Sequence, residues 1–138
     1  MSAAENKRLL EAAFAETAKG NGRLFVGLMA DDVTWTIAGG SDWPRHYAGK
    51  AAVLGDLLAR VGSQFDGPNR CVADSFIAEG DRVVVEAHGQ NRTCHGAYEN
   101  RYCFVITFRA GRIATITEYM DTALAERRLP YADSVIAS

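Results

Sequence analysis

Apolar residues in the first half of the chain recur every three to four positions. Across residues 4–19 they fall on one side, with charged residues on the other, which predicts an amphipathic helix. Gly20-Asn21-Gly22 ends this helix, because glycine and asparagine tolerate the backbone conformation found just past a helix C-terminus. The pattern predicts a short second helix over residues 23–30 and a third from Gly49 to about Gly62.

From Cys71 onward, apolar residues alternate with polar ones, which is the period of a strand. Turns at Gly80 and at Ala110-Gly111 indicate hairpins. We predict strands at residues 33–37, 71–79, 81–91, 98–109 and 112–120. A short helix capped by Asp121 or Thr122 follows, and the tail from Pro130 either frays or folds over an opening. Helices followed by an antiparallel meander indicate one α+β domain, spanning residues 1–138 with its core at about 4–128.

The two long strands near the end of the chain are apolar on both sides. In residues 102–108, Phe104 and Ile106 share one face, and Cys103 and Val105 share the other. A sheet with one face in water shows a more polar side than this. We therefore expect helices to cover one face and a second copy of the chain, in a symmetric homodimer, to cover the other.

One carboxylate stands out on the otherwise uncharged strand 112–120. Glu118 shares a face with Ala114, Ile116 and Met120, so it is expected to point into the protein. Burial without a partner raises the pKa of a carboxyl group, which is the usual state of a general acid or base that works near neutral pH. The alternatives are a Glu at the rim of the sheet and a Glu held in a structural ion pair.

Bulk composition narrows the function without defining it. The chain has 138 residues, 48% of them hydrophobic and 23% charged, with a net charge of −2. These values are typical of a globular protein, and they show no excess of basic residues of the kind that binds nucleic acid. No apolar run reaches the length needed to span a membrane, and the polar N-terminus lacks the hydrophobic stretch of a signal peptide. A cytoplasmic protein is the expectation.

The cysteines are interpreted as small buried hydrophobic residues. Cys71, Cys94 and Cys103 form an odd set without C-x-x-C spacing. Cys94 and His95 together suggest a nucleophile with its base or part of a zinc site. Adjacent residues of a strand point to opposite faces, however, and no second ligand pair is suitably spaced, so no metal site is predicted.

The order of elements resembles a known superfamily. It is carried by Met29-Ala-Asp-Asp-Val-Thr-Trp35, by Tyr47-Ala-Gly-Lys-Ala-Ala52, and by the final Phe108-Arg-Ala-Gly-Arg-Ile-Ala-Thr-Ile-Thr-Glu-Tyr-Met-Asp-Thr122. The chain is similar to the SnoaL-like branch of the nuclear transport factor two-like superfamily, whose relatives include ketosteroid isomerase, limonene epoxide hydrolase and polyketide cyclases. The resemblance covers about residues 4–128. It implies a cone-shaped fold: a strongly bent, mostly antiparallel sheet wrapped around the N-terminal helices, with an internal apolar pocket and dimerisation through the outer sheet face.

The resemblance carries over one functional residue clearly. Ketosteroid isomerases place acidic or phenolic groups where this chain has Phe14, Ile37 and Phe104, so their catalytic set is absent. Cyclases and limonene epoxide hydrolase keep an acid on the last strand, three residues before a second acid, and Glu118-Tyr-Met-Asp121 matches that pattern. The resemblance therefore implies that Glu118 is the acid/base residue and that Asp121 is a helix cap. The residues that grip water in the epoxide hydrolase correspond to Trp35 and Ile37.

The helper of Glu118 is left open by the sequence. Glu86 and His88 share one strand face, which is either a pocket wall that brings His88 to Glu118 or a solvated face opposite the valines. Asn100 and Tyr102 are candidate donors to an oxyanion, and Trp35 and Trp43 candidate aromatic walls. The predicted catalytic residues are Glu118, His88 and Tyr102, and the predicted pocket-lining residues are Phe14, Trp35, Ile37, Trp43, Tyr47, Glu86, Asn100, Phe104, Ile116 and Met120.

These observations predict a pocket enzyme without a metal or redox cofactor. It would move protons on an apolar or cyclic small molecule, as an isomerase, a cyclase, or a hydratase or hydrolase. A non-catalytic binding module and a protein-association domain are the alternatives, because no catalytic set of the relatives is complete. Neither nucleic acid nor membrane is an expected partner.

Overall fold

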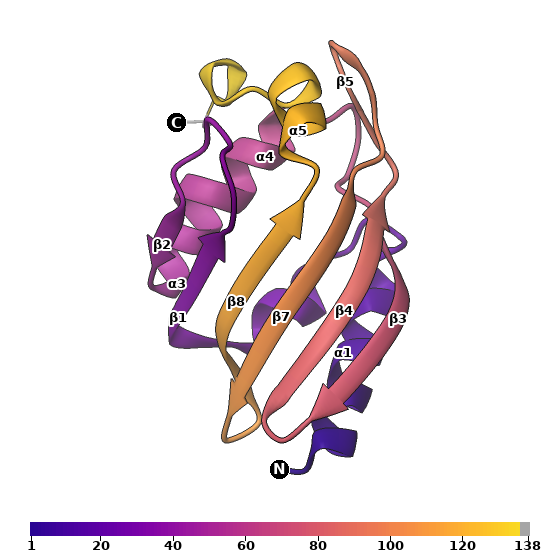
Figure 1. The fold of residues 1–138 in the computed structure, drawn as a ribbon, viewed down its shortest axis with the longest axis vertical. Coiled ribbons are helices and arrows are strands. Elements are labelled where there is room, and N and C mark those ends of the chain that lie inside the picture. Colours follow the sequence, from indigo (N-terminus) through magenta and orange to yellow (C-terminus); the bar gives the residue numbers. More distant parts are fainter. Residues whose placement is uncertain (136–138) are drawn as a thin grey trace.

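The computed structural model describes residues 1–135, which form a curved sheet with helices packed on one side (Figure 1). None of the helices described is long and apolar enough to cross a membrane. In chain order the elements are α1 (Ala3–Thr17), α2 (Arg23–Leu28), β1 (Met29–Ile37), β2 (His46–Ala48), α3 (Lys50–Ala52), the π-helix η1 (Val53–Leu58), α4 (Ala59–Ser63), β3 (Cys71–Glu79), β4 (Arg82–Gly89), β5 (Asn91–Thr93), β6 (Gly96–Tyr98), β7 (Arg101–Arg109), β8 (Arg112–Met120), α5 (Thr122–Arg128) and the 3-10 helix η2 (Tyr131–Asp133).

The first helix begins at a cap that the sequence supplies. The Ser2 hydroxyl accepts a hydrogen bond from the Glu5 N–H, and the Glu5 carboxylate accepts one from the Ser2 N–H. Leu10, Ala13 and Phe14 are buried on one side of α1. This apolar side packs against β3 and β4, which fixes α1 beneath one half of the sheet.

The predicted third helix is one continuous helical segment with a π-helical centre. Residues 50–63 run through α3, η1 and α4 without a break. A π-turn widens the helix locally and shifts the side chains that follow it around the axis. Val53 and Leu57 are buried here, so the widened part faces the interior.

The sheet is mixed and open, with strand order β2-β1-β8-β7-β4-β3. β1 and β8 run parallel, and the remaining neighbours in this sheet are antiparallel. Ala114 is an extra residue in β8, because Ile113 pairs with Phe108 and Thr115 with Thr107. Such bulges bend a strand. The predicted α+β class and bent, mostly antiparallel sheet around N-terminal helices are confirmed.

Four strands match their predicted ranges closely: β3, β4, β7 and β8. The equally long β1 and the three-residue strands do not. β1 begins at Met29, inside the segment predicted as helix, and β2 lies between the predicted strand 33–37 and the predicted third helix, where no strand is predicted. The segment after Gly89 forms a separate hairpin of β5 and β6, which was predicted partly as strand ends and partly as a loop. Three-residue strands contain too few positions to show a period of two.

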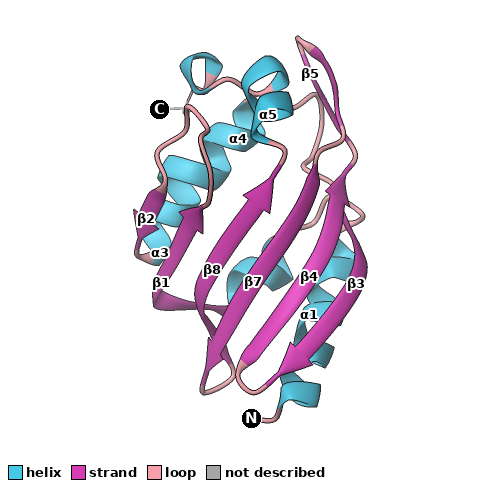
Figure 2. Ribbon diagram, in the orientation of Figure 1, coloured by secondary structure: helices cyan, strands magenta, loops and turns pink. Residues whose placement is uncertain are grey.

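One face of the sheet carries the helices, and the other carries none among residues 1–135 (Figure 2). Val83 and Val85 of β4 are fully buried on the helix side, which we call the inner face. Glu86 and His88 lie on the opposite, outer face. The placement of Glu86 and His88 in the pocket is therefore wrong, because the valines form the core.

The C-terminal segment folds back over α4 and the loop before β2. Trp43 donates from its indole Nε1 to the Leu129 carbonyl at 2.8 Å, and its ring meets Tyr131 edge-on. Gln64 donates to the Pro130 carbonyl at 2.7 Å. Asp121 caps α5 by accepting from the Leu124 N–H, as predicted. The tail up to Val135 is thus attached to the protein, and Ile136 lies outside the described residues.

Candidate functional site

A cavity of about 430 Å³ lies between the inner face of the sheet and the helices. Its walls are mostly aliphatic and aromatic, as in sites for small organic molecules. It is lined by Phe14, Thr17, Gly20, Gly22, Phe25, Val26, Trp35, Leu54, Leu57, Leu58, Ala59, Val61, Phe65, Asn69, Cys71, Tyr102, Phe104 and Glu118.

Glu118 is the one carboxylate among these lining residues. It sits on β8, directly opposite Phe104 of β7 and beside Ile37 of β1. The Trp35 indole donates from Nε1 to Glu118 Oε1 at 2.9 Å, and the carboxyl group is buried, with a relative exposure of 8%. Within residues 1–135, no other hydrogen bond and no ion pair reaches this carboxyl group, so Oε2 is left for a ligand.

Burial sets the protonation of Glu118. Loss of solvation raises its pKa to about 7, and the hydrogen bond from Trp35 opposes this shift only in part, since it stabilises the charged form. Near neutral pH the group therefore exists in both protonation states. A carboxyl group in this condition can accept a proton and return it, which general acid/base catalysis requires.

Tyr102 is the phenol at the same wall. Its ring stacks on Phe104, with centroids 5.3 Å apart and planes 18° apart. Burial raises the pKa of Tyr102 well above its ordinary value, and the nearby Tyr98 and Glu118 add to the effect. The hydroxyl therefore stays protonated and serves as a hydrogen-bond donor at neutral pH.

Cys71 contributes a thiol to the cavity, but in an unreactive form. Burial raises its pKa to about 12, and the Glu118 charge adds to the shift. Because the thiolate is the nucleophile, a thiol held this strongly protonated is inert. Thr17 and Asn69 supply the remaining polar side chains; Thr17 already donates to the Cys71 carbonyl at 2.7 Å.

The structure brings five of the predicted residues to one cavity: Glu118, Tyr102, Phe14, Trp35 and Phe104. They come from α1, β1, β7 and β8, and share the inner side. Phe14 meets Phe104 at 6.1 Å between ring centroids, and Trp35 meets Phe104 at the same distance. Aromatic rings thus flank the carboxyl group on the side of α1 and β1.

His88 and Glu86 lie on the outer face, away from this cavity. His88 Nδ1 is 2.9 Å from the Asp74 carboxylate, and the Ser75 hydroxyl donates to Glu86 at 2.7 Å. The predicted pairing of His88 with Glu118 is therefore contradicted. Val85, and not Glu86, pairs with Phe104, and Phe104 pairs with Glu118, so the side chains of β4 that share Glu118's face are the valines.

Asn100 and Trp43 are occupied by structural contacts outside the cavity. The Asn100 side chain donates to the Tyr98 hydroxyl and the Asp121 carbonyl, and it accepts from the Arg101 and Asp121 N–H groups. Its amide has no donor left for an oxyanion. Trp43 holds the C-terminal segment, as described above. Neither residue lines the cavity.

The other predicted lining residues pack beside the cavity without reaching it. Ile37, Tyr47 and Ile116 are buried in the core, and the Met120 sulfur lies 4.0 Å from the Tyr98 hydroxyl. None of these four residues lines the cavity. For Ile37 and Ile116 the predicted face is correct, because both share the inner face with Glu118, but helices and neighbouring side chains fill the space in front of them.

Apart from Phe14 of α1, the cavity walls that the helices contribute are missing from the prediction. Leu54, Leu57, Leu58 and Val61 come from the segment 50–63, and Phe25 comes from α2. The apolar stripe of the predicted third helix, which includes Leu57, Leu58 and Val61, indicates a buried side but not what that side meets. Thr17 belongs to the predicted apolar side of the first helix, but nothing in the sequence shows that it meets Asn69, in the loop before β3, and Cys71, the first residue of β3.

Comparisons with known proteins agree with this fold. The sequence profile of the SnoaL-like domain matches residues 10–116. An NTF2-like protein from Burkholderia xenovorans is 28% identical, with a TM-score of 0.70 over 93% of this chain and 98% of that one. No match was found among curated proteins.

Two more distant crystal structures share the fold and carry provisional functional names. A SnoaL-like polyketide cyclase from Jannaschia is 12% identical, with a TM-score of 0.72 over 91% of this chain and 92% of that one. An isomerase from Bacillus subtilis is 18% identical, with a TM-score of 0.74 over 99% of this chain and 100% of that one. At these identities the likeness concerns the fold alone.

Proposed function

Because the chain belongs to the SnoaL-like domain family, we propose that it is an acid/base enzyme that moves a proton on an apolar, cyclic small molecule without a cofactor. The observation that carries this proposal is a single carboxyl group, Glu118, on the wall of a 430 Å³ apolar cavity with a pKa of about 7. The names given to two relatives of this fold, polyketide cyclase and isomerase, belong to the same class of chemistry.

Each polar group of the cavity has a role in the proposed reaction. The Glu118 carboxylate takes a proton from a carbon beside a substrate carbonyl, and the electron pair of that C–H bond moves toward the carbonyl oxygen. The Tyr102 hydroxyl stays protonated and donates to Tyr98 in the free protein; in the proposed reaction it turns to donate to the substrate oxygen as negative charge develops there. Glu118 then returns its proton to another atom of the same molecule, so the net reaction is an isomerisation or a ring closure.

Trp35 positions the catalytic carboxyl group. Its indole N–H binds Oε1 and leaves Oε2 to face the substrate. The hydrogen bond also stabilises the carboxylate form, so it holds the pKa of Glu118 below the value that burial alone would give. A second contact between Trp35 and Phe104, edge-on at 6.1 Å, keeps the indole in place.

Proton transfer is tested without knowing the natural substrate. Cyclic ketones that stabilise the protein against heat are incubated with it in heavy water, and deuterium incorporation is followed by mass spectrometry. We expect Glu118→Gln to slow exchange by roughly 100- to 10,000-fold. Glu86→Gln is the matched control, because it makes the same change on the outer face. Equal exchange rates for Glu118→Gln and the wild type would end the proposal.

A binding module that leaves its ligand unchanged is the second candidate. One observation favours it: the other ionisable groups among the lining residues, Tyr102 and Cys71, both have raised pKa values, so Glu118 has no second proton carrier beside it. This candidate predicts that a ligand found by native mass spectrometry stays bound without deuterium exchange. Exchange that depends on Glu118 would exclude it.

The outer face of the sheet is proposed to form a homodimer interface. Ile77, Val84 and Val105 are paired in a row across β3, β4 and β7. Ile77 is 62% exposed, and Tyr119 on the same side of the sheet is 50% exposed. A second copy of the chain, related by a two-fold axis, would cover this apolar row with the same row.

A further inference from the structure

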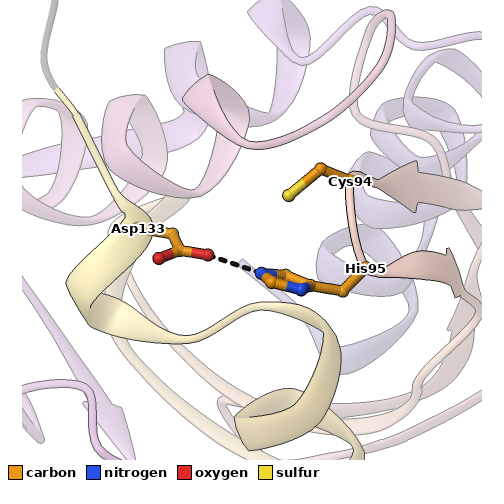
Figure 3. A group of neighbouring side chains, drawn as sticks. All are labelled: Cys94, His95 and Asp133. Atoms are coloured by element: carbon orange, nitrogen blue, oxygen red, sulfur yellow. Dashed lines mark hydrogen bonds and ion pairs between the residues drawn. The ribbon is translucent and has the colours of Figure 1, made fainter.

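Three side chains of types that can bind a metal lie close together where the β5–β6 hairpin meets the C-terminal segment, outside the cavity. Cys94 and His95 occupy the turn between β5 and β6, and Asp133 ends the 3-10 helix η2 (Figure 3). One ligand atom of each side chain lies within 4.8 Å of the others, and all three residues are exposed. His95 Nε2 is hydrogen-bonded to the Asp133 carboxylate.

The turn explains why Cys94 and His95 face the same partner. Side chains alternate between faces along a strand, but these two residues lie between the strands, so alternation does not apply. Figure 3 shows both side chains directed toward Asp133. The expectation that Cys94 and His95 point to opposite faces is therefore wrong, because they lie in a turn and not in a strand.

Each half of the cluster is held by contacts that do not use the three side chains. On the hairpin, the Thr93 hydroxyl accepts from the His95 N–H at 3.1 Å and donates to the Arg128 carbonyl. Arg128 donates to the His95 carbonyl at 2.8 Å. On η2, the Tyr131 N–H donates to Asp42 at 2.9 Å. The backbone positions of the cluster are thus fixed before any ligand arrives.

We propose that Cys94, His95 and Asp133 form a binding site for a divalent transition metal of the zinc type, with water as the fourth ligand. Thiolate, imidazole and carboxylate are the three side-chain ligands that Zn²⁺ takes in proteins. Bonds of about 2.0 to 2.3 Å to a tetrahedral ion place neighbouring ligand atoms about 3.3 to 3.8 Å apart. The present separations, within 4.8 Å, need only rotations of exposed side chains to reach that geometry.

Binding replaces a proton with the metal. The ion takes the place of the Cys94 thiol proton, which is released, and it ligates His95 Nε2 in the tautomer that carries the ring proton on Nδ1, in place of the hydrogen bond between Nε2 and Asp133. The alternative, a Cys–His–Asp nucleophile, needs a cleft that holds a substrate against the thiol. None of the three residues lines the cavity described above. A bound ion would tie the β5–β6 hairpin to the C-terminal segment.

Cobalt and zinc binding to the untagged protein test the site. We expect one equivalent of Co²⁺ to give a near-ultraviolet thiolate-to-cobalt charge-transfer band that Zn²⁺ abolishes. Cys94→Ser should remove the band, and His95→Asn and Asp133→Asn should each weaken Zn²⁺ binding in calorimetry by roughly tenfold or more. Cys103→Ser is the matched control, because Cys103 lies on the outer face of β7, away from the cluster.

A second measurement separates the site from adventitious binding. Zn²⁺ should raise the Tm of the wild type and of Cys103→Ser, but not that of any variant of the three ligands, since only a native site stabilises the fold. Circular dichroism confirms that each variant is folded. The proposal is overturned if the wild type gives no charge-transfer band, or if the ligand variants bind Zn²⁺ as tightly as the wild type does.

Discussion

Carboxyl groups on the inner and outer faces of the same sheet differ in their exposure to water. On the inner face, Glu118 accepts one hydrogen bond, from Trp35, and is shielded from water. On the outer face, Asp74 and Glu86 are exposed and lie beside His88 and Ser75. Burial raises the pKa of Glu118 to about 7. Loss of solvation is the main cause of this shift, and of these three carboxyl groups only Glu118 is buried.

The apolar residues of the two faces differ in the same way. Ile106 on the inner face is 0% exposed, whereas Ile77 on the outer face is 62% exposed. The inner isoleucine therefore stabilises the fold by burying apolar surface, whereas the outer isoleucine leaves apolar surface open to contact with another molecule. This contrast gives matched variants that separate the roles of the two faces.

The largest expected effect comes from truncating an inner isoleucine. Ile106→Ala removes buried methylene and methyl groups and leaves a cavity, which should lower the free energy of unfolding by about 2 to 5 kcal/mol. Ile77→Ala, measured where the protein is monomeric, should change it by roughly 0.5 kcal/mol or less. Urea unfolding followed by circular dichroism measures both. Equal losses from the two variants would contradict the contrast between the faces.

The next effect is the pH dependence of stability caused by Glu118. Its folded pKa of about 7 exceeds the model-compound value of 4.5, so the folded state holds a proton that the unfolded state has lost between these pH values. Stability contributed by this group is therefore complete below pH 4.5 and is lost as pH rises through 7. The full difference corresponds to about 3 kcal/mol.

Glu118→Gln isolates this contribution from other titrating groups. The variant keeps the shape of the side chain but removes its titration, so its stability should decline less than that of the wild type between pH 5 and pH 8. Urea unfolding at each pH, compared between the two proteins, cancels the contribution that all other groups make to both. Parallel pH profiles would show that the pKa of Glu118 is not raised.

The sequence predicts those parts of the structure that a local pattern controls. Strands 71–79 and 112–120 are predicted correctly because their apolar residues alternate and tight turns bound them. β1 also has nine residues, but only its part from Val33 is predicted, because its first four residues do not alternate. Glu118 was placed inside because apolar residues flank it at every second position. The hairpin of β5 and β6 was missed, since its strands have three residues each.

The environment of Glu118 depends on register, which a local pattern does not fix. Residue spacing placed His88 outside, opposite the valines, whereas the family resemblance favoured the pocket, and the structure agrees with the spacing. Trp35 reaches Glu118 through the parallel pairing of β1 with β8, residues 83 positions apart in sequence. The meeting of Cys94-His95 with Asp133 likewise follows from the folded C-terminal segment.

The smallest effect concerns the outer face and the proposed dimer. Ile77→Lys places a charge in the row that a second copy would cover, and the two-fold axis brings two such charges into one interface. We expect the dimer Kd to rise about tenfold, which corresponds to about 1.4 kcal/mol. Leu24→Lys is the matched control, because Leu24 is also exposed, at 45%, but lies on α2, outside the sheet. Sedimentation over a range of concentrations measures the dimer Kd of each variant. The outer face is not the interface if the wild type stays monomeric throughout, or if Leu24→Lys weakens the dimer as much as Ile77→Lys does.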